Sequence, residues 1–321
     1  MMAVVQITPW HWAGFIGCVL IFLALDLGVF HRRAHVVKFS EALAWTILWV
    51  TLAFTFAGLL SLMRGKTEAV EFVTGYVIEL SLSMDNVFVI ALIFAYFRVP
   101  SQYQHRVLFW GILGALVMRG AMIAAGAALV QRFQWMLYLF GGFLLVTGVK
   151  MLFVKNEGVQ PEKNLVVRCA RKMFPVSHEL DGQNFLTRQN GRRMLTPLAL
   201  VLLVVETTDL IFATDSIPAI FAVTTKPFIV FTSNVFAILG LRSLYFVLAG
   251  AIGYFRHLKT GLSLVLVFIG MKMLLAPHGG SHAKFQVEIP TGIALLVVAA
   301  ILTVAIALSI VAARREGREQ P

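Results

Sequence analysis

Long apolar runs separated by short polar segments dominate this chain. A helix needs about 20 mostly apolar residues to cross the hydrocarbon core of a bilayer. Nine runs approach or exceed that length, and they lie at roughly 12–30, 42–63, 72–97, 107–130, 133–154, 194–225, 228–254, 260–276 and 289–312. The pattern therefore predicts an all-α polytopic membrane protein with about nine transmembrane helices.

The composition agrees with a membrane protein. The 321 residues are 59% hydrophobic and 13% charged, and the mean hydropathy is +0.84, which is too apolar for a soluble domain. The first run follows neither a basic segment nor a small-residue cleavage site, so we interpret it as a retained helix. The only long polar segment, 155–193, is predicted to be a cytoplasmic loop within a single transmembrane domain, 1–321.

The basic residues predict the orientation of the chain. With the N-terminus outside, the inner segments hold 18 Lys and Arg residues and the outer segments hold five. Cytoplasmic loops carry such an excess, so we expect the N-terminus outside and the C-terminus inside. The net charge of +11 then faces anionic lipid. This distribution favours the lipid bilayer as partner and argues against nucleic acid.

Two segments of the chain resemble each other. The stretch "ELSLSMDNV" at 79–87 aligns with "DLIFATDSI" at 209–217, and "LLVTGVKML" at 144–152 aligns with "LVFIGMKML" at 266–274. Between these blocks, Arg119 matches Arg242. The first alignment pairs Glu79 with Asp209, Asp85 with Asp215, and Asn86 with Ser216.

We interpret 72–154 and 194–276 as two copies of a three-helix unit. Because three is odd, the two copies must cross the membrane in opposite directions, and the last helix, 289–312, follows them. Inverted repeats of this kind are typical of transporters, whose substrate site lies near the middle of the membrane where the repeats meet.

Ionisable residues inside the predicted spans raise the free energy of inserting the helices into the membrane. Each charge at the centre of a spanning helix costs about 2.5–3.5 kcal/mol, so these groups need partners, protons or a bound cation. One interpretation is structural, with Arg119 and Arg242 neutralising carboxylates. The other is a cation site. The acids are Asp26, Glu79, Asp85, Glu206, Asp209 and Asp215, and the cations are Arg119, Lys150, Arg242 and Lys272.

Positions along the helices separate these groups. Lys150, Lys272 and Asp26 lie near predicted ends, where we expect the lysines to extend to the interface; the role of Asp26 stays open. Glu79 and Asn86 are seven residues apart and share a helical face, as do Asp209 and Ser216, with Glu206 beside them. The list of predicted cation ligands is Glu79, Asp85, Asn86, Glu206, Asp209, Asp215 and Ser216.

A straight helix would point some of these acids at lipid. Asp85 and Asp215 fall about 120° from the first acid of each copy. Pro218 cannot donate to the Thr214 carbonyl, so we predict a helix break there, and broken helices hold cations with carboxylates and freed carbonyls. Oxygen ligands suit Mn²⁺, Mg²⁺ or Ca²⁺ better than Zn²⁺ or Cu⁺.

Other functions find less support in the sequence. An intramembrane aspartyl protease would also use two aspartates, but the chain contains no GxGD motif. No paired cysteines and no flavin or haem motif are visible, so we expect neither an enzyme nor a permanently bound cofactor.

The same stretches resemble a known family. "GYVIELSLSMDNVFV", "VVETTDLIFATDSIPAIFAVT" and "SNVFAILGLRSLYFVLAG" are similar to the TerC family of membrane proteins, especially its Alx branch. The resemblance implies nine helices in a bacterial inner membrane and export of Mn²⁺. It places the family's acidic motifs on the seven predicted ligands. It also brings two family labels, a tellurite factor and a redox modulator.

The leading hypothesis is therefore a secondary transporter that exports Mn²⁺ in exchange for protons. The resemblance also implies a second one, in which the protein docks on secretion machinery and supplies metal to exported enzymes. The segment 155–193 would then be the docking surface.

Overall fold

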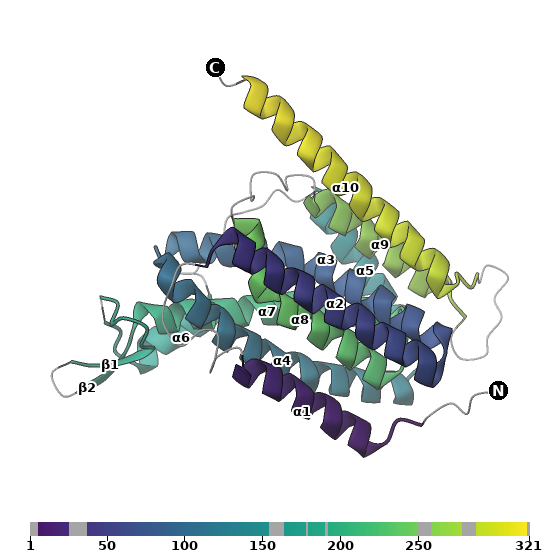
Figure 1. Ribbon diagram of the computed structural model, residues 1–321, viewed down its shortest axis with the longest axis horizontal. Coiled ribbons are helices and arrows are strands. Elements are labelled where there is room, and N and C mark those ends of the chain that lie inside the picture. The colour runs from purple at the N-terminus through teal and green to yellow at the C-terminus, as the bar shows by residue number, and fades with distance from the viewer. Residues whose placement is uncertain are drawn as a thin grey trace.

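Long helices make up most of the described residues in this computed structural model (Figure 1). The structure describes residues 6–25, 37–153, 164–177, 179–189, 192–249, 258–277 and 287–319. The helices are α1 (Pro9–Leu25), α2 (Phe39–Arg64), α3 (Lys66–Tyr96), α4 (Ser101–Arg132), α5 (Met136–Phe153), α6 (Leu165–Met173), α7 (Pro197–Phe221), α8 (Pro227–Ala249), α9 (Leu258–Leu275) and α10 (Thr291–Glu319). The two strands are β1 (Leu186–Gln189) and β2 (Arg192–Leu195).

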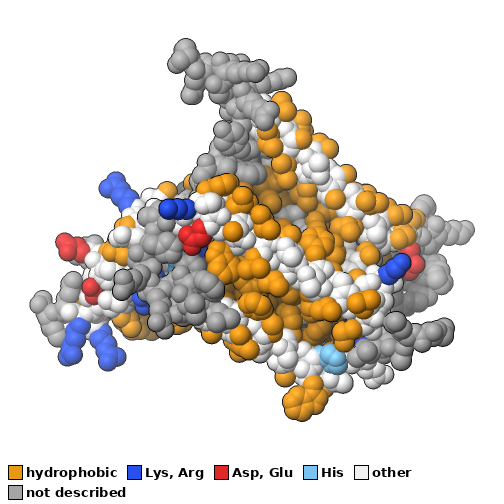
Figure 2. Space-filling model, viewed as in Figure 1, with side chains coloured by type: hydrophobic (Ala, Val, Ile, Leu, Met, Phe, Trp, Pro, Cys, Tyr) orange, Lys and Arg blue, Asp and Glu red, His pale blue; other side chains and the backbone are white. Residues whose placement is uncertain are grey.

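The prediction of an all-α polytopic membrane protein is confirmed. In the described ranges, eight helices are long and apolar enough to cross a bilayer, namely α2 to α5 and α7 to α10, and α1 is a shorter apolar helix. Hydrophobic side chains cover the middle of the face in Figure 2, and charged ones gather towards its edges. This is the surface that a lipid solvent requires. Asp26 lies outside the described residues.

Helices α5 and α9 pack so closely that their backbones touch. A Cβ atom on Gly270 would lie 2.8 Å from the Gly141 carbonyl oxygen, and one on Gly148 would lie 3.0 Å from the Ser263 carbonyl oxygen. The sequence alignment pairs Gly148 with Gly270 and Gly141 with Ser263, so the same contact occurs twice. The residue order runs in opposite directions along the two helices, which is the arrangement that oppositely inserted copies predict.

The remaining repeat helices also pack across the two copies. Helix α3 lies against α8, where Phe94 and Tyr245 meet with ring centroids 5.5 Å apart. Helix α4 lies against α7, where a Cβ atom on Gly111 would be 3.3 Å from the Val205 side chain. This crosswise packing brings α3 and α7 together in the centre of the bundle.

The segment between the repeats is partly folded, which the sequence analysis did not predict. Helix α6 begins at the Asn164 side chain, which accepts hydrogen bonds from Val166 N at 2.9 Å and Val167 N at 3.4 Å. Strands β1 and β2 form an antiparallel hairpin beyond the ends of the long helices (Figure 1). Arg106 at the start of α4 holds this segment, because its guanidinium lies over the Phe185 ring at 5.5 Å.

Candidate functional site

Arg119 occupies the middle of the bundle and joins the two repeats. Its side chain is 2% exposed and pairs with Glu79 of α3 and Asp209 of α7. Towards Asp209 the guanidinium uses two nitrogens, with Nη2 at 2.8 Å from Oδ1 and Nε at 3.1 Å from Oδ2. Nη1 also lies 3.3 Å from Ser216 Oγ. Such two-pronged contacts are the geometry in which arginine binds carboxylates most strongly.

The pairing explains how these charges persist in the core. Glu79 is fully buried and Asp209 is nearly so, with 11% of its side chain exposed. Removing one partner from a buried ion pair typically costs about 3–5 kcal/mol because it leaves an uncompensated charge. With two carboxylates around one guanidinium, the cluster keeps a formal charge of −1.

The contacts around Arg119 follow the repeat alignment. Asn86 Nδ2 donates to Asp209 Oδ1 at 3.2 Å. In the repeat alignment, Ser216 is equivalent to Asn86 and Glu79 is equivalent to Asp209. Ser216 and Glu79 both contact Arg119. Helices α3 and α7 therefore cross in opposite directions at this level and supply matched side chains to one place.

A small cavity lies beside Arg119. Its volume is about 30 Å³, which is room for a single water-sized species. Asp85 of α3 and Asp215 of α7 both line it, and the Thr147 side chain hydrogen-bonds Asp215. The full lining is Leu82, Asp85, Asn86, Arg119, Met151, Phe212, Asp215, Ser216, Leu262 and Leu266.

Four buried side-chain oxygens on α3 and α7 lack a hydrogen-bond partner among the described residues. They are Glu79 Oε2, Ser83 Oγ, Asn86 Oδ1 and Glu206 Oε2. An unsatisfied buried acceptor costs about 1–3 kcal/mol, and such groups call for an explanation such as an ion or water. The Asn86 side chain lines the cavity, so a cation placed there would lie next to an unused oxygen.

Glu206 lies against α4, at a glycine that the sequence analysis missed. A Cβ atom on Gly114 would be 2.0 Å from Glu206 Oε1. Gly114 therefore makes room for this carboxyl group. The sequence alone does not single out Gly114, because the same helix contains several other glycines.

Each copy's arginine has a different environment. The sequence predicts that Arg242 compensates the acid cluster as Arg119 does, but Arg242 Nη1 lies 3.4 Å from His105 Nε2. His105 is about 21 Å from Arg119 along α4, at 1.5 Å for each residue. Arg242 is thus outside the Arg119 cluster, because α8 packs against α4 nearer to the start of α4.

The two lysines also differ. Lys150 is exposed, in agreement with its predicted position at the interface. Lys272 is only 8% exposed and its Nζ lies 3.4 Å from the Ala222 carbonyl oxygen. The end of α7 thus offers Lys272 a backbone acceptor within the bundle, so its ammonium group is covered by protein instead of being exposed like that of Lys150.

The predicted break at Pro218 is absent. Helix α7 continues through Pro218 to Phe221. Because Pro218 lies three residues before the helix end, it removes one backbone hydrogen bond, to Thr214, and little helix follows it. Asp215 reaches the cavity from this continuous helix.

A second polar cluster lies where α2 ends and α3 begins. Lys226 Nζ is 3.2 Å from Glu68 Oε1 and 3.1 Å from Glu71 Oε2, and the Thr224 hydroxyl donates to Glu71 at 2.8 Å. Arg64 pairs with Glu68. The sequence does not indicate this cluster, because the apolar run predicts that the third helix begins at 72, after both acids.

The acids do not form a closed metal cage in this structure. Among the described residues, no three His, Cys, Asp or Glu side chains converge on one point as metal ligands. Arg119 instead separates Glu79 and Asp209 from the cavity that Asp85 and Asp215 line. The arrangement offers two carboxylates and two neutral oxygens at one small space, with a fixed positive charge beside it.

Apolar spanning helices around buried ion pairs define a polytopic membrane protein. The family described as "Integral membrane protein TerC family" matches residues 64–317. The chain belongs to the TerC family.

Several bacterial relatives match most of this chain. It is 52% identical over 307 residues to "Uncharacterized membrane protein STKORF319" of Myxococcus xanthus, covering 96% of this chain and 94% of the relative. Identity to "Putative membrane-bound redox modulator Alx" is 46% over 311 residues for Salmonella typhi, covering 94% of each chain. For Escherichia coli (strain K12) it is 49% over 277 residues, covering 84% and 86%. No solved structure matches the chain significantly.

Proposed function

We propose that this protein is a secondary transporter that exports Mn²⁺, or a similar hard divalent cation, from the cytoplasm. The observation that carries the proposal is the shared cavity, into which each repeat contributes one aspartate, Asp85 or Asp215. Inverted-repeat transporters bind their substrates at such a junction. We infer that the protein moves ions and does not catalyse a chemical reaction.

The cavity offers the ligands that a hard cation prefers. Asp85 and Asp215 supply two negative charges, which balance one divalent ion, and Asn86 and Ser216 add neutral oxygens. Oxygen ligands of this kind suit Mn²⁺, Mg²⁺ and Ca²⁺. Met151 adds a thioether to the wall, and a softer donor favours Mn²⁺ over the harder Mg²⁺ and Ca²⁺.

Arg119 acts as the counter-ion of the empty state. It neutralises Glu79 and Asp209 and also lines the cavity. A divalent cation in the cavity repels the guanidinium and attracts these two carboxylates. Cation entry and the ion pairs of Arg119 are therefore coupled, which links site occupancy to the packing of α3, α4 and α7. Glu206 lies three residues before Asp209 on α7 and does not line the cavity.

Orientation and location follow from the charge distribution and the bacterial relatives. We place the N-terminus outside and the C-terminus inside a bacterial inner membrane, with α6 and the β1–β2 hairpin in the cytoplasm. The cluster of Glu68, Glu71 and Lys226 then lies at the outer end of the bundle.

Export requires an energy source. Moving a divalent cation outward against 100 mV, negative inside, costs about 4.6 kcal/mol. Protons that enter from outside and bind the same carboxylates supply it. The test is Mn²⁺ uptake into inverted vesicles with and without a pH gradient at fixed membrane potential. The rate of Mn²⁺ uptake should fall when the pH gradient is collapsed. An uptake rate that is the same with and without the gradient would contradict proton coupling.

A second candidate function is delivery of metal to exported enzymes, with secretion machinery as the partner. The observation that favours it is the folded segment of α6 and the hairpin, which presents exposed Arg192 and Arg193 beyond the long helices. Thr196 N donates to the Phe185 carbonyl oxygen at 3.0 Å, so 186–195 can be replaced by a short linker. That deletion should spare vesicle transport and reduce metal loading of secreted enzymes if delivery is the function.

The redox label of the Alx relatives leads to a separate test. Both cysteines of this chain, Cys18 and Cys169, are free thiols on different helices. Replacement of both by serine should leave Mn²⁺ transport unchanged. A loss of transport in that variant would favour redox control instead.

A further inference from the structure

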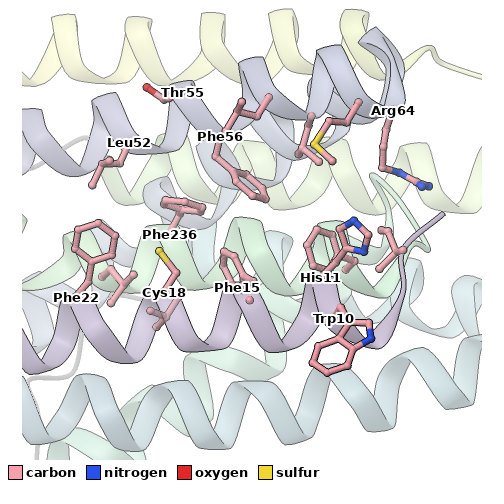
Figure 3. A pocket seen from close by; sticks show the side chains of 18 of the residues that line it. Trp10, His11, Phe15, Cys18, Phe22, Leu52, Thr55, Phe56, Arg64 and Phe236 are labelled. Carbon is pink, nitrogen blue, oxygen red and sulfur yellow. The ribbon is translucent and has the colours of Figure 1, made fainter. Parts of the chain in front are cut away.

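Helix α1 is held to the bundle by aromatic side chains with a cavity beside them. Trp12 meets Phe228 with ring centroids 5.2 Å apart, and Phe22 meets Trp49 at 5.7 Å. Between α1 and α2 lies a cavity of about 610 Å³ (Figure 3). Its walls come from α1, α2 and α8, so it is distinct from the site around Arg119.

The body of this cavity is almost entirely apolar. Phe15 and Phe22 of α1 and Leu52 and Phe56 of α2 line it in Figure 3. The Thr55 hydroxyl, also on the wall, donates to the Thr51 carbonyl oxygen at 2.8 Å. Water needs two or more polar partners to stay in a cavity. The space therefore suits a hydrocarbon.

The cavity is long and runs along the helices. On α2 its lining extends from Trp49 to Arg64, which is about 22 Å at 1.5 Å for each residue. The hydrocarbon core of a bilayer is about 30 Å thick. An extended lipid chain fits this length, whereas a compact guest would leave much of it empty.

Among the described lining residues, the one charged side chain, Arg64, and the histidine, His11, lie at the end where α1 begins and α2 ends. His11 Nδ1 accepts a hydrogen bond from Thr8 N at 3.1 Å, so Nε2 carries the proton of the neutral ring and can donate. The Arg64 guanidinium lies at the same end (Figure 3) and pairs with Glu68. Lys226 contacts both Glu68 and Glu71, and exposed Lys66 follows Arg64 by two residues, so three basic residues face two acids in this region and its formal charge is positive.

We propose that this cavity binds one acyl chain of an anionic phospholipid, whose phosphate lies at the end lined by His11 and Arg64. The dry, elongated body matches the chain, and the positive end at membrane-surface level matches the phosphate. The lipid fills the gap between α1 and α2 and fastens α1 to the bundle. This proposal does not depend on the transported ion.

Two glycines of α1 provide a matched test. A Cβ atom on Gly14 or Gly17 would meet nothing within 4 Å, but only Gly14 lines the cavity. Purified protein in a neutral detergent is titrated with phosphatidylglycerol and with phosphatidylcholine of the same chains, and the apparent Tm is measured. Phosphatidylglycerol should raise the Tm more than phosphatidylcholine. The rise should persist in Gly17→Phe and disappear in Gly14→Phe.

Equal Tm shifts with the two lipids would overturn the anionic head group, and a full shift in Gly14→Phe would overturn the cavity as the site. If the Tm rise disappears in Gly17→Phe as well as in Gly14→Phe, the lipid binds generally along α1, and the proposal is contradicted.

A second measurement leaves the cavity intact. Cys18 lines it, and Cys169→Ser removes the other thiol. Alkylation of Cys18 by a membrane-permeant maleimide is timed with and without phosphatidylglycerol. At a lipid concentration ten times the dissociation constant, alkylation should slow about tenfold because only the empty fraction reacts. If phosphatidylglycerol raises the Tm but leaves the rate of Cys18 alkylation unchanged, the lipid binds outside this cavity.

Discussion

Asp85 of α3 and Asp215 of α7 are 130 residues apart in the sequence and line the same cavity of about 30 Å³. They hold equivalent positions in the two repeats, and the antiparallel crossing of α3 and α7 brings them to one place. Two carboxylates at one buried space repel each other when both are ionised. A divalent cation between them removes that repulsion, which is why the cavity, rather than either residue alone, carries the proposed function.

The transport proposal predicts that each cavity aspartate is essential. Asp85→Asn and Asp215→Asn each remove one charge and keep the shape, so the protein should still insert and fold. The loss of a charge-assisted ligand is worth about 1.5–3 kcal/mol, so the apparent Mn²⁺ affinity in vesicle transport should fall about 10- to 150-fold. The matched control is Asp181→Asn, on the exposed segment between the repeats, which should transport normally. Normal transport by both cavity variants would refute the site.

Arg119 should matter for folding as well as for transport. Arg119→Gln leaves Glu79 and Asp209 buried without their cation and should lower stability by about 3–5 kcal/mol, measured as a fall in the apparent Tm. Excess Mn²⁺ should recover part of the loss because the ion replaces the missing charge. Arg132→Gln, at the exposed end of α4, is the control. An Arg119→Gln protein as stable as the native one would show that these ion pairs contribute nothing.

Met151 should affect selectivity more than affinity. Met151→Leu keeps the volume of the cavity wall and removes the sulfur, so Mg²⁺ and Ca²⁺ should compete better with Mn²⁺. The measurement is inhibition of Mn²⁺ uptake by each ion. Met271→Leu, on the lipid-exposed face of α9, should leave competition unchanged. If competition by Mg²⁺ and Ca²⁺ is also unchanged in Met151→Leu, the thioether has no role in selecting the ion.

The contact between α5 and α9 can be tested with paired glycines. A Cβ atom on Gly270 would come within 2.7 Å of Leu145 N and 2.8 Å of the Gly141 carbonyl oxygen, whereas one on Gly142 would meet nothing within 4 Å. Gly270→Ala should therefore push the helices apart and cost about 1–3 kcal/mol, and Gly142→Ala should cost nothing. Thermal unfolding in detergent distinguishes them, and equal Tm values would contradict the close packing.

The sequence predicts much of this fold because spanning helices leave a strong apolar signal. The repeat alignment pairs Asp85 with Asp215 and Glu79 with Asp209, and the structure places each pair near Arg119. The helix ends are harder to predict: α3 begins at Lys66, so Glu68 and Glu71 belong to the helix, because a helix can extend past the hydrocarbon core into polar sequence.

The differences between the two copies could not be predicted from their similarity. Arg119 and Arg242 match in the alignment, but Arg119 pairs with Glu79 and Asp209 whereas Arg242 lies beside His105, because side-chain partners depend on how the helices are staggered. Lys272 is buried by the helices around α9, while Lys150 faces outward. Helix α6 is too short to span and leaves no hydropathy signal.

The most direct test of the central claim is Mn²⁺ binding to the purified protein, followed by electron paramagnetic resonance. The account predicts one tightly bound Mn²⁺ for each native chain, and loss of that signal in Asp85→Asn and in Asp215→Asn but not in Asp181→Asn. Undiminished Mn²⁺ binding in both cavity variants would contradict the claim that the two repeats hold one cation between them.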